Sequence, residues 1–76
     1  MNKNLLKAIK KVADCQVIKL IIQGKQKDCI QVDTDYLGPY APAETFDIKN
    51  NVDKILKRYP KYKAEWRGHY TSIFIY

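Results

Sequence analysis

QVIKLIIQGKQKDCIQVD, residues 16–33, is the stretch from which the fold is predicted. Apolar side chains alternate with other residues on both sides of a polar centre, and β-branched residues are frequent; the alternating apolar positions are Ile18, Leu20 and Ile22, then Ile30 and Val32. This alternation is typical of two half-buried strands. The polar residues 24–27 between them are expected to form a turn, so the segment predicts a β-hairpin.

The apolar positions also predict a register for this hairpin. Pairing Ile22 with Ile30, with 20/32 and 18/34 following, stacks one apolar face. The same register sets Lys19 opposite Asp33, a cross-strand pair of opposite charge that contributes a few tenths of a kcal/mol, about 0.2–1 at most. It also leaves Cys15 far from Cys29, so we expect two reduced thiols rather than a disulfide.

A helix is predicted before the hairpin, over residues 4–13. Its apolar residues fall on one helical face, and its three lysines lie outside that face, as does Lys3 just before it. The apolar residues are Leu5, Leu6, Ile9, Val12 and Ala13. Asn2 or Asn4 is expected to cap the helix N-terminus.

After the hairpin, residues 35–44 carry two prolines and a glycine, and we expect a long loop there. Residues 45–48 are then predicted to form a short edge strand. A second helix is expected to begin at Asn50 or Asn51 and to end before Pro60. Its predicted inner face consists of Val52, Ile55, Leu56 and Tyr59.

The last part of the chain predicts a second hairpin, with Gly68 and His69 as a two-residue turn. Tyr62, Ala64 and Trp66 alternate with Lys63, Glu65 and Arg67, and Ile73 and Ile75 alternate with Phe74 and Tyr76. The element order is therefore α-β-β, loop, α-β-β. We expect one α+β domain over residues 1–76, in which two α-β-β units form a roughly four-stranded antiparallel sheet with both amphipathic helices on one face. The two units either descend from a duplication or resemble each other by coincidence.

Charge is distributed in blocks along the 76 residues. The net charge is +6, yet the part from Asp28 to Asp47 holds five acids and no lysine or arginine, while each flanking segment carries seven basic residues. Segregated charge gives a folded domain two unlike surfaces and favours a binding partner. No apolar run approaches the roughly 20 residues that span a bilayer, and no signal peptide is evident, so a cytoplasmic protein without membrane contact is expected.

Residue types that carry catalysis are sparse. His69 lies in the predicted turn, where a general acid or base has no cavity to shape its pKa; some small ribonucleases use a histidine beside basic residues, but an exposed turn residue is the better interpretation. Asp33 and Asp35 match no calcium-loop spacing, and the three glycines lie in separate turns rather than in a phosphate-binding loop. We therefore expect no enzyme activity, no metal and no cofactor.

Two basic surfaces are candidates for binding an anionic partner. The first is the set of cationic side chains on the two helices: Lys7, Lys10, Lys11, Lys54, Lys57 and Arg58. The second is the face of the C-terminal hairpin opposite the helices, where basic and aromatic residues mix: Lys63, Arg67, Tyr70, Phe74 and Tyr76. Such a mixture can stack bases and neutralise phosphates, although ordinary sheet packing or a homodimer contact is the more common explanation.

Two functions follow from these patterns. The first is a small non-enzymatic module that binds nucleic acid or a nucleic-acid-binding protein complex. The second is a phage- or mobile-element-type inhibitor or adaptor that binds a host or defence-system protein through an acidic, tyrosine-bearing loop, as a monomer or homodimer. The residues expected to carry this second function are Asp35, Tyr36, Tyr40, Glu44 and Asp47.

Overall fold

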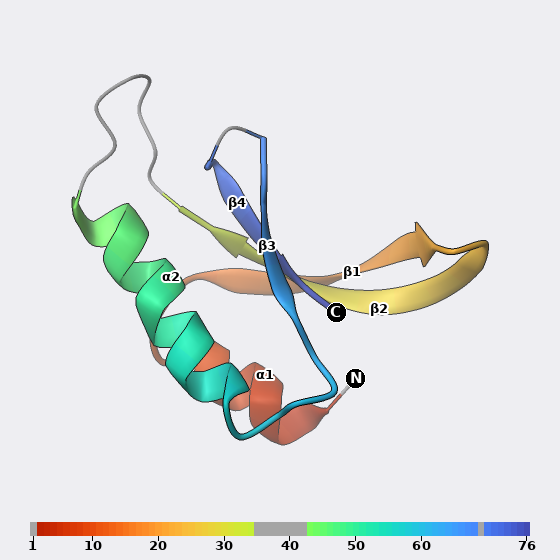
Figure 1. Ribbon diagram of the computed structural model, residues 1–76, viewed down its shortest axis with the longest axis horizontal. Coiled ribbons are helices and arrows are strands. Elements are labelled where there is room, and N and C mark those ends of the chain that lie inside the picture. Colours follow the sequence, from red (N-terminus) through yellow and green to blue (C-terminus); the bar gives the residue numbers. More distant parts are fainter. Residues whose placement is uncertain (1, 35–42, 69) are drawn as a thin grey trace.

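The structure, a computed structural model, describes residues 2–34, 43–68 and 70–76, and only the backbone of Ala43 and Glu44. Two helices and four strands follow one another in the order α1, β1, β2, α2, β3, β4 (Figure 1). Their bounds are α1 Lys3–Lys10, β1 Cys15–Ile22, β2 Lys25–Asp33, α2 Ala43–Leu56, β3 Ala64–Arg67 and β4 Ser72–Ile75. The strands form one antiparallel sheet in the order β1-β2-β4-β3. The predicted α+β class with a four-stranded antiparallel sheet is confirmed.

One buried cluster forms the hydrophobic core and draws on both helices and on one face of the sheet. Its members are Leu5, Ile9, Ile30, Val32, Val52, Ile55, Leu56, Ile73 and Ile75. Strand pairing explains the contribution of the sheet, because Ile30 is opposite Ile75 and Val32 is opposite Ile73 on β2 and β4. We call this side of the sheet the core face and the other side the outer face.

The predicted register of the first hairpin is wrong. The turn contains only Gln23 and Gly24, which both have positive φ (53° and 77°), and Ile22 pairs with Lys25. Two left-handed residues make the type I′ turn, whose twist matches that of the flanking strands, so this short turn is favoured over a four-residue one. Ile30 is consequently opposite Val17 rather than Ile22, so β1 is displaced by five residues relative to β2 from the predicted register.

This shift moves the apolar residues of β1 to the other side of the sheet. An odd displacement exchanges the two faces of a strand, so Ile18, Leu20 and Ile22 lie on the outer face, half-buried, rather than beside Ile30. The predicted pair between Lys19 and Asp33 does not form. Lys19 is opposite Asp28 instead, with 3.8 Å between Nζ and Oδ1.

The predictions for the second helix also need correction. Residues 45–48 are helical rather than an edge strand, and α2 begins at Ala43, seven residues before the expected Asn50 cap. The helical face explains the difference, because Thr45 and Val52 are fully buried and Ile48 is half-buried between them, at spacings of three and four residues. Residues 35–42 of the predicted loop lie outside the described residues, and residues 43–44 belong to α2.

Other local predictions agree with the structure. The side chain of Asn2 caps α1, since its Oδ1 accepts hydrogen bonds from the backbone N–H groups of Asn4 (2.9 Å) and Leu5 (3.1 Å). Cys15 and Cys29 are free thiols. Among the described residues, none of the helices has the length and apolar composition needed to cross a membrane.

The second hairpin follows the predicted alternation but not the predicted turn. Ala64 pairs with Ile75 and Trp66 with Ile73, so these four residues share the core face as expected. Arg67 pairs with Ser72, which leaves residues 68–71 as the connection, longer than the two-residue turn predicted. His69, one of the two residues of that turn, lies outside the described residues.

Candidate nucleic-acid interface

The outer face of the C-terminal hairpin brings together the basic and aromatic residues that the alternation predicts. Lys63 Nζ lies 5.0 Å from the centre of the Tyr76 ring, and Arg67 Cζ lies 5.4 Å from the centre of the Phe74 ring. Both aromatic residues are half-buried, and both cationic residues are exposed. We call Lys63, Arg67, Phe74 and Tyr76 the aromatic–basic face.

Tyr70 does not belong to this face, contrary to its predicted placement. It has a positive φ of 71° in the connection before β4, and its ring lies 5.0 Å from that of Trp66 and 6.2 Å from that of Phe46. Trp66 is on the core face and Phe46 is on α2. The longer connection therefore carries Tyr70 to the core face, beside Trp66 and Phe46.

Glu65 contacts two residues of the aromatic–basic face, Tyr76 and Arg67, although the sequence prediction assigned it no role. Its Oε1 accepts a hydrogen bond from the Tyr76 hydroxyl at 2.6 Å, and its Oε2 lies 3.0 Å from Arg67 Nη2. The hydrogen bond from Tyr76, with a smaller attraction to Arg67, lowers the pKa of the Glu65 carboxyl below its ordinary value. The same hydrogen bond raises the pKa of the Tyr76 hydroxyl. The strand pairing of Glu65 with Phe74 is the signal that places it here.

The two rings of the aromatic–basic face come from the central strand β4 and the residue directly after it, whereas Arg67 lies on the edge strand β3 and Lys63 directly before it. β4 is bonded to β2 on one side and to β3 on the other, and Tyr76 extends its pairing by exchanging backbone hydrogen bonds with Lys63 (2.8 and 3.0 Å). Residues of the outer face are absent from the core cluster and from the half-buried residues packed on it. Both rings therefore lie on the side of the sheet that faces away from the main core cluster.

A hollow of about 320 Å³ adjoins Tyr76 and adds two cations that the sequence prediction left out. It is lined by Ile22, Gln23, Lys27, Pro60, Lys61, Tyr62, Lys63 and Tyr76. Lys27 comes from β2 and Lys61 from the segment after α2. Only the tertiary fold brings these segments together, so no local sequence pattern indicates this part of the site.

Cys29 of β2 is a buried residue on the outer face of the sheet. It is fully buried, it is opposite Ile18, and burial raises the pKa of its thiol. A protonated thiol is a poor nucleophile and a poor metal ligand. Cys29 therefore acts as a small apolar residue beneath the surface.

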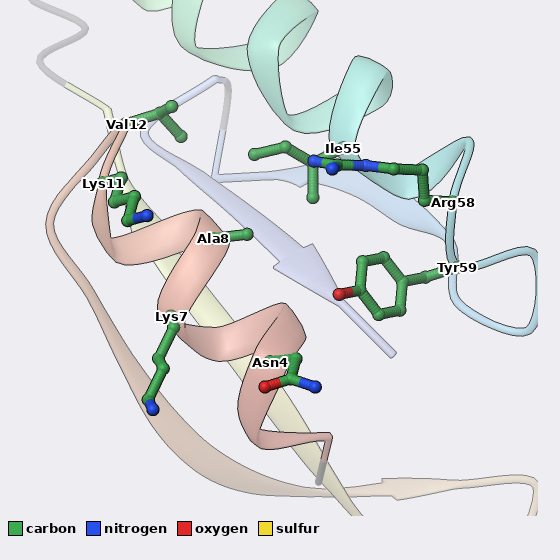
Figure 2. Close-up of a pocket in the computed structure, with 8 residues that line it drawn as sticks. All are labelled: Asn4, Lys7, Ala8, Lys11, Val12, Ile55, Arg58 and Tyr59. Carbon is green, nitrogen blue, oxygen red and sulfur yellow. The ribbon is translucent and has the colours of Figure 1, made fainter.

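The predicted helical surface is only partly assembled. Lys7 and Lys11 of the α1 segment and Arg58 after α2 line one groove of about 490 Å³, together with the apolar residues Ala8, Val12 and Ile55 and the polar residues Asn4 and Tyr59. Figure 2 shows the Tyr59 ring pointing toward α1, whereas the Lys7 side chain points away from α2. Lys10, Lys54 and Lys57 are exposed and do not line this groove.

The residues predicted to bind a protein lie mostly beyond the structural description. Asp35, Tyr36 and Tyr40 are outside the described residues, as is the side chain of Glu44. Asp47 is exposed on α2. Within the described part of the chain, no group of three or more His, Cys, Asp or Glu side chains is placed to hold a metal ion.

No protein-family model matches the chain, and no curated protein or solved structure matches it.

Proposed function

We propose that this protein is a small non-enzymatic module that binds nucleic acid, alone or within a nucleic-acid–protein complex, through the aromatic–basic face. The observation that carries the proposal is the position of Phe74 on the central strand β4 and of Tyr76 directly after it, on the same face of the sheet, each with a cationic side chain over its ring. Open sheet faces with aromatic residues on central strands are a general way to bind bases, and the cations can neutralise phosphates.

Charge supports the same partner. Lys63, Arg67, Lys27 and Lys61 lie on or beside the face. Two acids also lie there: Glu65 contacts Tyr76 and Arg67, and Asp28 lines a neighbouring hollow beside Tyr76. A net charge of +6 favours an anionic ligand over long range as well. The proposal includes two α-β-β units with both helices as one layer on the core face, because that arrangement leaves the outer face open. It places the protein in the cytoplasm, where two free thiols are stable.

The test compares the salt dependence of binding in two charge-matched variants. K63Q/R67Q removes two positive charges from the aromatic–basic face, and K10Q/K54Q removes two from exposed positions on α1 and α2 that line no described hollow. Each phosphate contact contributes about 0.7 to the slope of log affinity against log salt for a single strand. We expect the slope to fall by about 1.4 for K63Q/R67Q and to change little for K10Q/K54Q.

Chromatography on immobilised nucleic acid and on heparin, with size exclusion at about 50 and 200 mM salt, supplies the measurement. Size exclusion also reports whether the protein is a monomer or a homodimer. Failure of the wild-type protein to bind nucleic acid or heparin at the lower salt concentration would contradict the proposal. Equal losses in the two variants would show that bulk charge, rather than this face, determines binding.

The second candidate, an inhibitor or adaptor that binds a host protein, rests on a different feature. Phe46 and Tyr70 are 48% and 44% exposed and contact Trp66, so three aromatic rings form a surface cluster on the helical side. Exposed aromatic clusters are common anchors of protein interfaces. F46S/Y70S is expected to lose a protein partner recovered by affinity capture from the source cell. The control I21S changes a residue of the β1–β2 hairpin that is 79% exposed, and this variant should retain the partner.

A further inference from the structure

We infer that the ligand of the aromatic–basic face is a single strand, whose bases stack on Phe74 and Tyr76 after its phosphates draw Arg67 and Lys63 off the two rings. This inference rests on the proposed function, and it names the kind of nucleic acid and the exchange of contacts that accompanies binding.

The spacing of the two rings indicates a single strand. Phe74 and Tyr76 are two residues apart along one strand, so their Cα atoms are about 6.6–6.8 Å apart. Neighbouring bases in a duplex are separated by about 3.4 Å along the helix and bury their faces against each other. One base on each ring therefore requires an extended, unstacked strand, and a duplex has no free base faces to offer.

Replacing a cation–ring contact by a stacked base is energetically favourable. A cation over an aromatic ring at an exposed site contributes about 2- to 5-fold to an equilibrium, whereas stacking of a base on an aromatic side chain contributes about 5- to 160-fold. The released cation also gains a phosphate as a partner. Arg67 gives up its ion pair with Glu65 in part, but both Arg67 and Glu65 are solvent-accessible there and such pairs contribute little.

The cations mark a path for the backbone of the strand. Arg67 lies at Phe74, Lys63 lies at Tyr76, and the adjoining hollow adds Lys61 and Lys27. This line of positive charge runs along β4 and continues beyond Tyr76. It matches about three or four successive phosphates, which is near the lower end of the footprints of single-strand-binding domains.

The experiment measures fluorescence anisotropy with three labelled probes of about 12 nucleotides: oligo-dT, oligo-U and a duplex of mixed sequence. Stacking does not use the 2′-hydroxyl group, so oligo-dT and oligo-U are expected to bind with similar affinity. F74L and Y76L keep an apolar side chain and remove the ring. We expect each substitution to weaken single-strand binding about 5- to 10-fold and to change duplex binding less than about 2-fold.

K10Q/K54Q serves as the control for loss of charge and should weaken single strands and duplex by the same factor. If F74L and Y76L leave single-strand affinity unchanged, or weaken duplex binding equally, the inference is overturned while the proposed function stands. Absence of binding to all three probes overturns the proposed function and the inference with it.

A second measurement uses the wild-type protein and does not depend on the folding of variants. A 5-iodouracil-containing single strand, irradiated on the protein, cross-links to aromatic side chains on which its bases stack. We expect mass spectrometry to locate the cross-links at Phe74 and Tyr76. Cross-links confined to α1 or α2 would overturn the inference.

Discussion

Glu65 shows how one carboxylate organises the outer face. It accepts a hydrogen bond from the Tyr76 hydroxyl and contacts Arg67. As a result, the pKa of Glu65 is lowered and the pKa of Tyr76 is raised. The pKa of Glu65 is lowered from 4.5, so its stabilising contribution is present above that value and is lost as pH falls through the folded pKa. The pKa of Tyr76 is raised from 10.0, so its contribution is present below that value and is lost as pH rises through the folded pKa.

Removal of the Tyr76 hydroxyl should therefore destabilise the protein mainly between these two pKa values. We expect Y76F to lower the free energy of unfolding at neutral pH and to differ less from the wild type in strong acid or strong alkali. Urea unfolding across the pH range measures this difference. NMR titration of the Glu65 carboxyl should show its pKa moving up toward the ordinary value in Y76F. An unchanged Glu65 titration would contradict the role assigned to this hydrogen bond.

Thr45 carries a buried hydroxyl that lacks a hydrogen-bond partner in the described structure. A buried polar group without a partner costs about 1–3 kcal/mol, and valine has nearly the same shape. We expect T45V to raise the free energy of unfolding by about 1 kcal/mol, measured by urea denaturation. T45S is the control, since it keeps the hydroxyl and removes a methyl group, and it should be less stable than the wild type. Destabilisation by T45V would show that the hydroxyl has a partner.

At the scale of elements, the β1–β2 hairpin depends on its two-residue turn. Gly24 has a φ of 77°, and a Cβ at this position would meet no other atom within 4 Å, so the cost of a side chain comes from the backbone alone. We expect G24A to lower the free energy of unfolding by about 1–2 kcal/mol. Q23N should be neutral or slightly stabilising, because asparagine tolerates the left-handed conformation. Thermal unfolding of both variants tests this, and a neutral G24A would contradict the turn assignment.

The two hairpins differ in how far the sequence determines them. In the second hairpin, Ala64 and Trp66 face Ile73 and Ile75 as the alternation predicts. In the first, apolar residues occupy both faces of β1, for example Val17 and Ile18, so several registers bury similar apolar surface. The turn then decides the register, and a conformation with positive φ at Gln23 is not evident from the residue type.

The early start of α2, at Ala43, was also not predictable from local residue preference. Thr45 and Phe46 suit a strand by intrinsic preference, yet burial of Thr45 and Ile48 on a helical face overrides that preference. For the site, strand alternation is enough to place Lys63, Arg67 and their rings on one face. Lys61 approaches Tyr76 only through tertiary packing, which no local pattern reports.

At the scale of the whole molecule, backbone protection should follow the strand order. β2 and β4 are the central strands, and Ile30, Val32, Ile73 and Ile75 are fully buried on them. We expect their amide hydrogens to exchange most slowly, at rates that report global unfolding. The amides at the turn of Gln23 and Gly24 should exchange fastest, since Ile21 beside them is 79% exposed. Hydrogen exchange followed by NMR tests this, and uniform protection along β1 and β2 would contradict it.

The position of β4 between β2 and β3 also has a consequence for synthesis on the ribosome. β4 is made after the other three strands, although it is the strand that joins the two hairpins into one sheet. Until β4 has left the exit tunnel, the β2 edge at Ile30 and Val32 has no partner on that side. An unpaired apolar strand edge is a site for chaperone binding or association between nascent chains. The nascent chain is thus exposed to both until β4 has emerged and paired with β2.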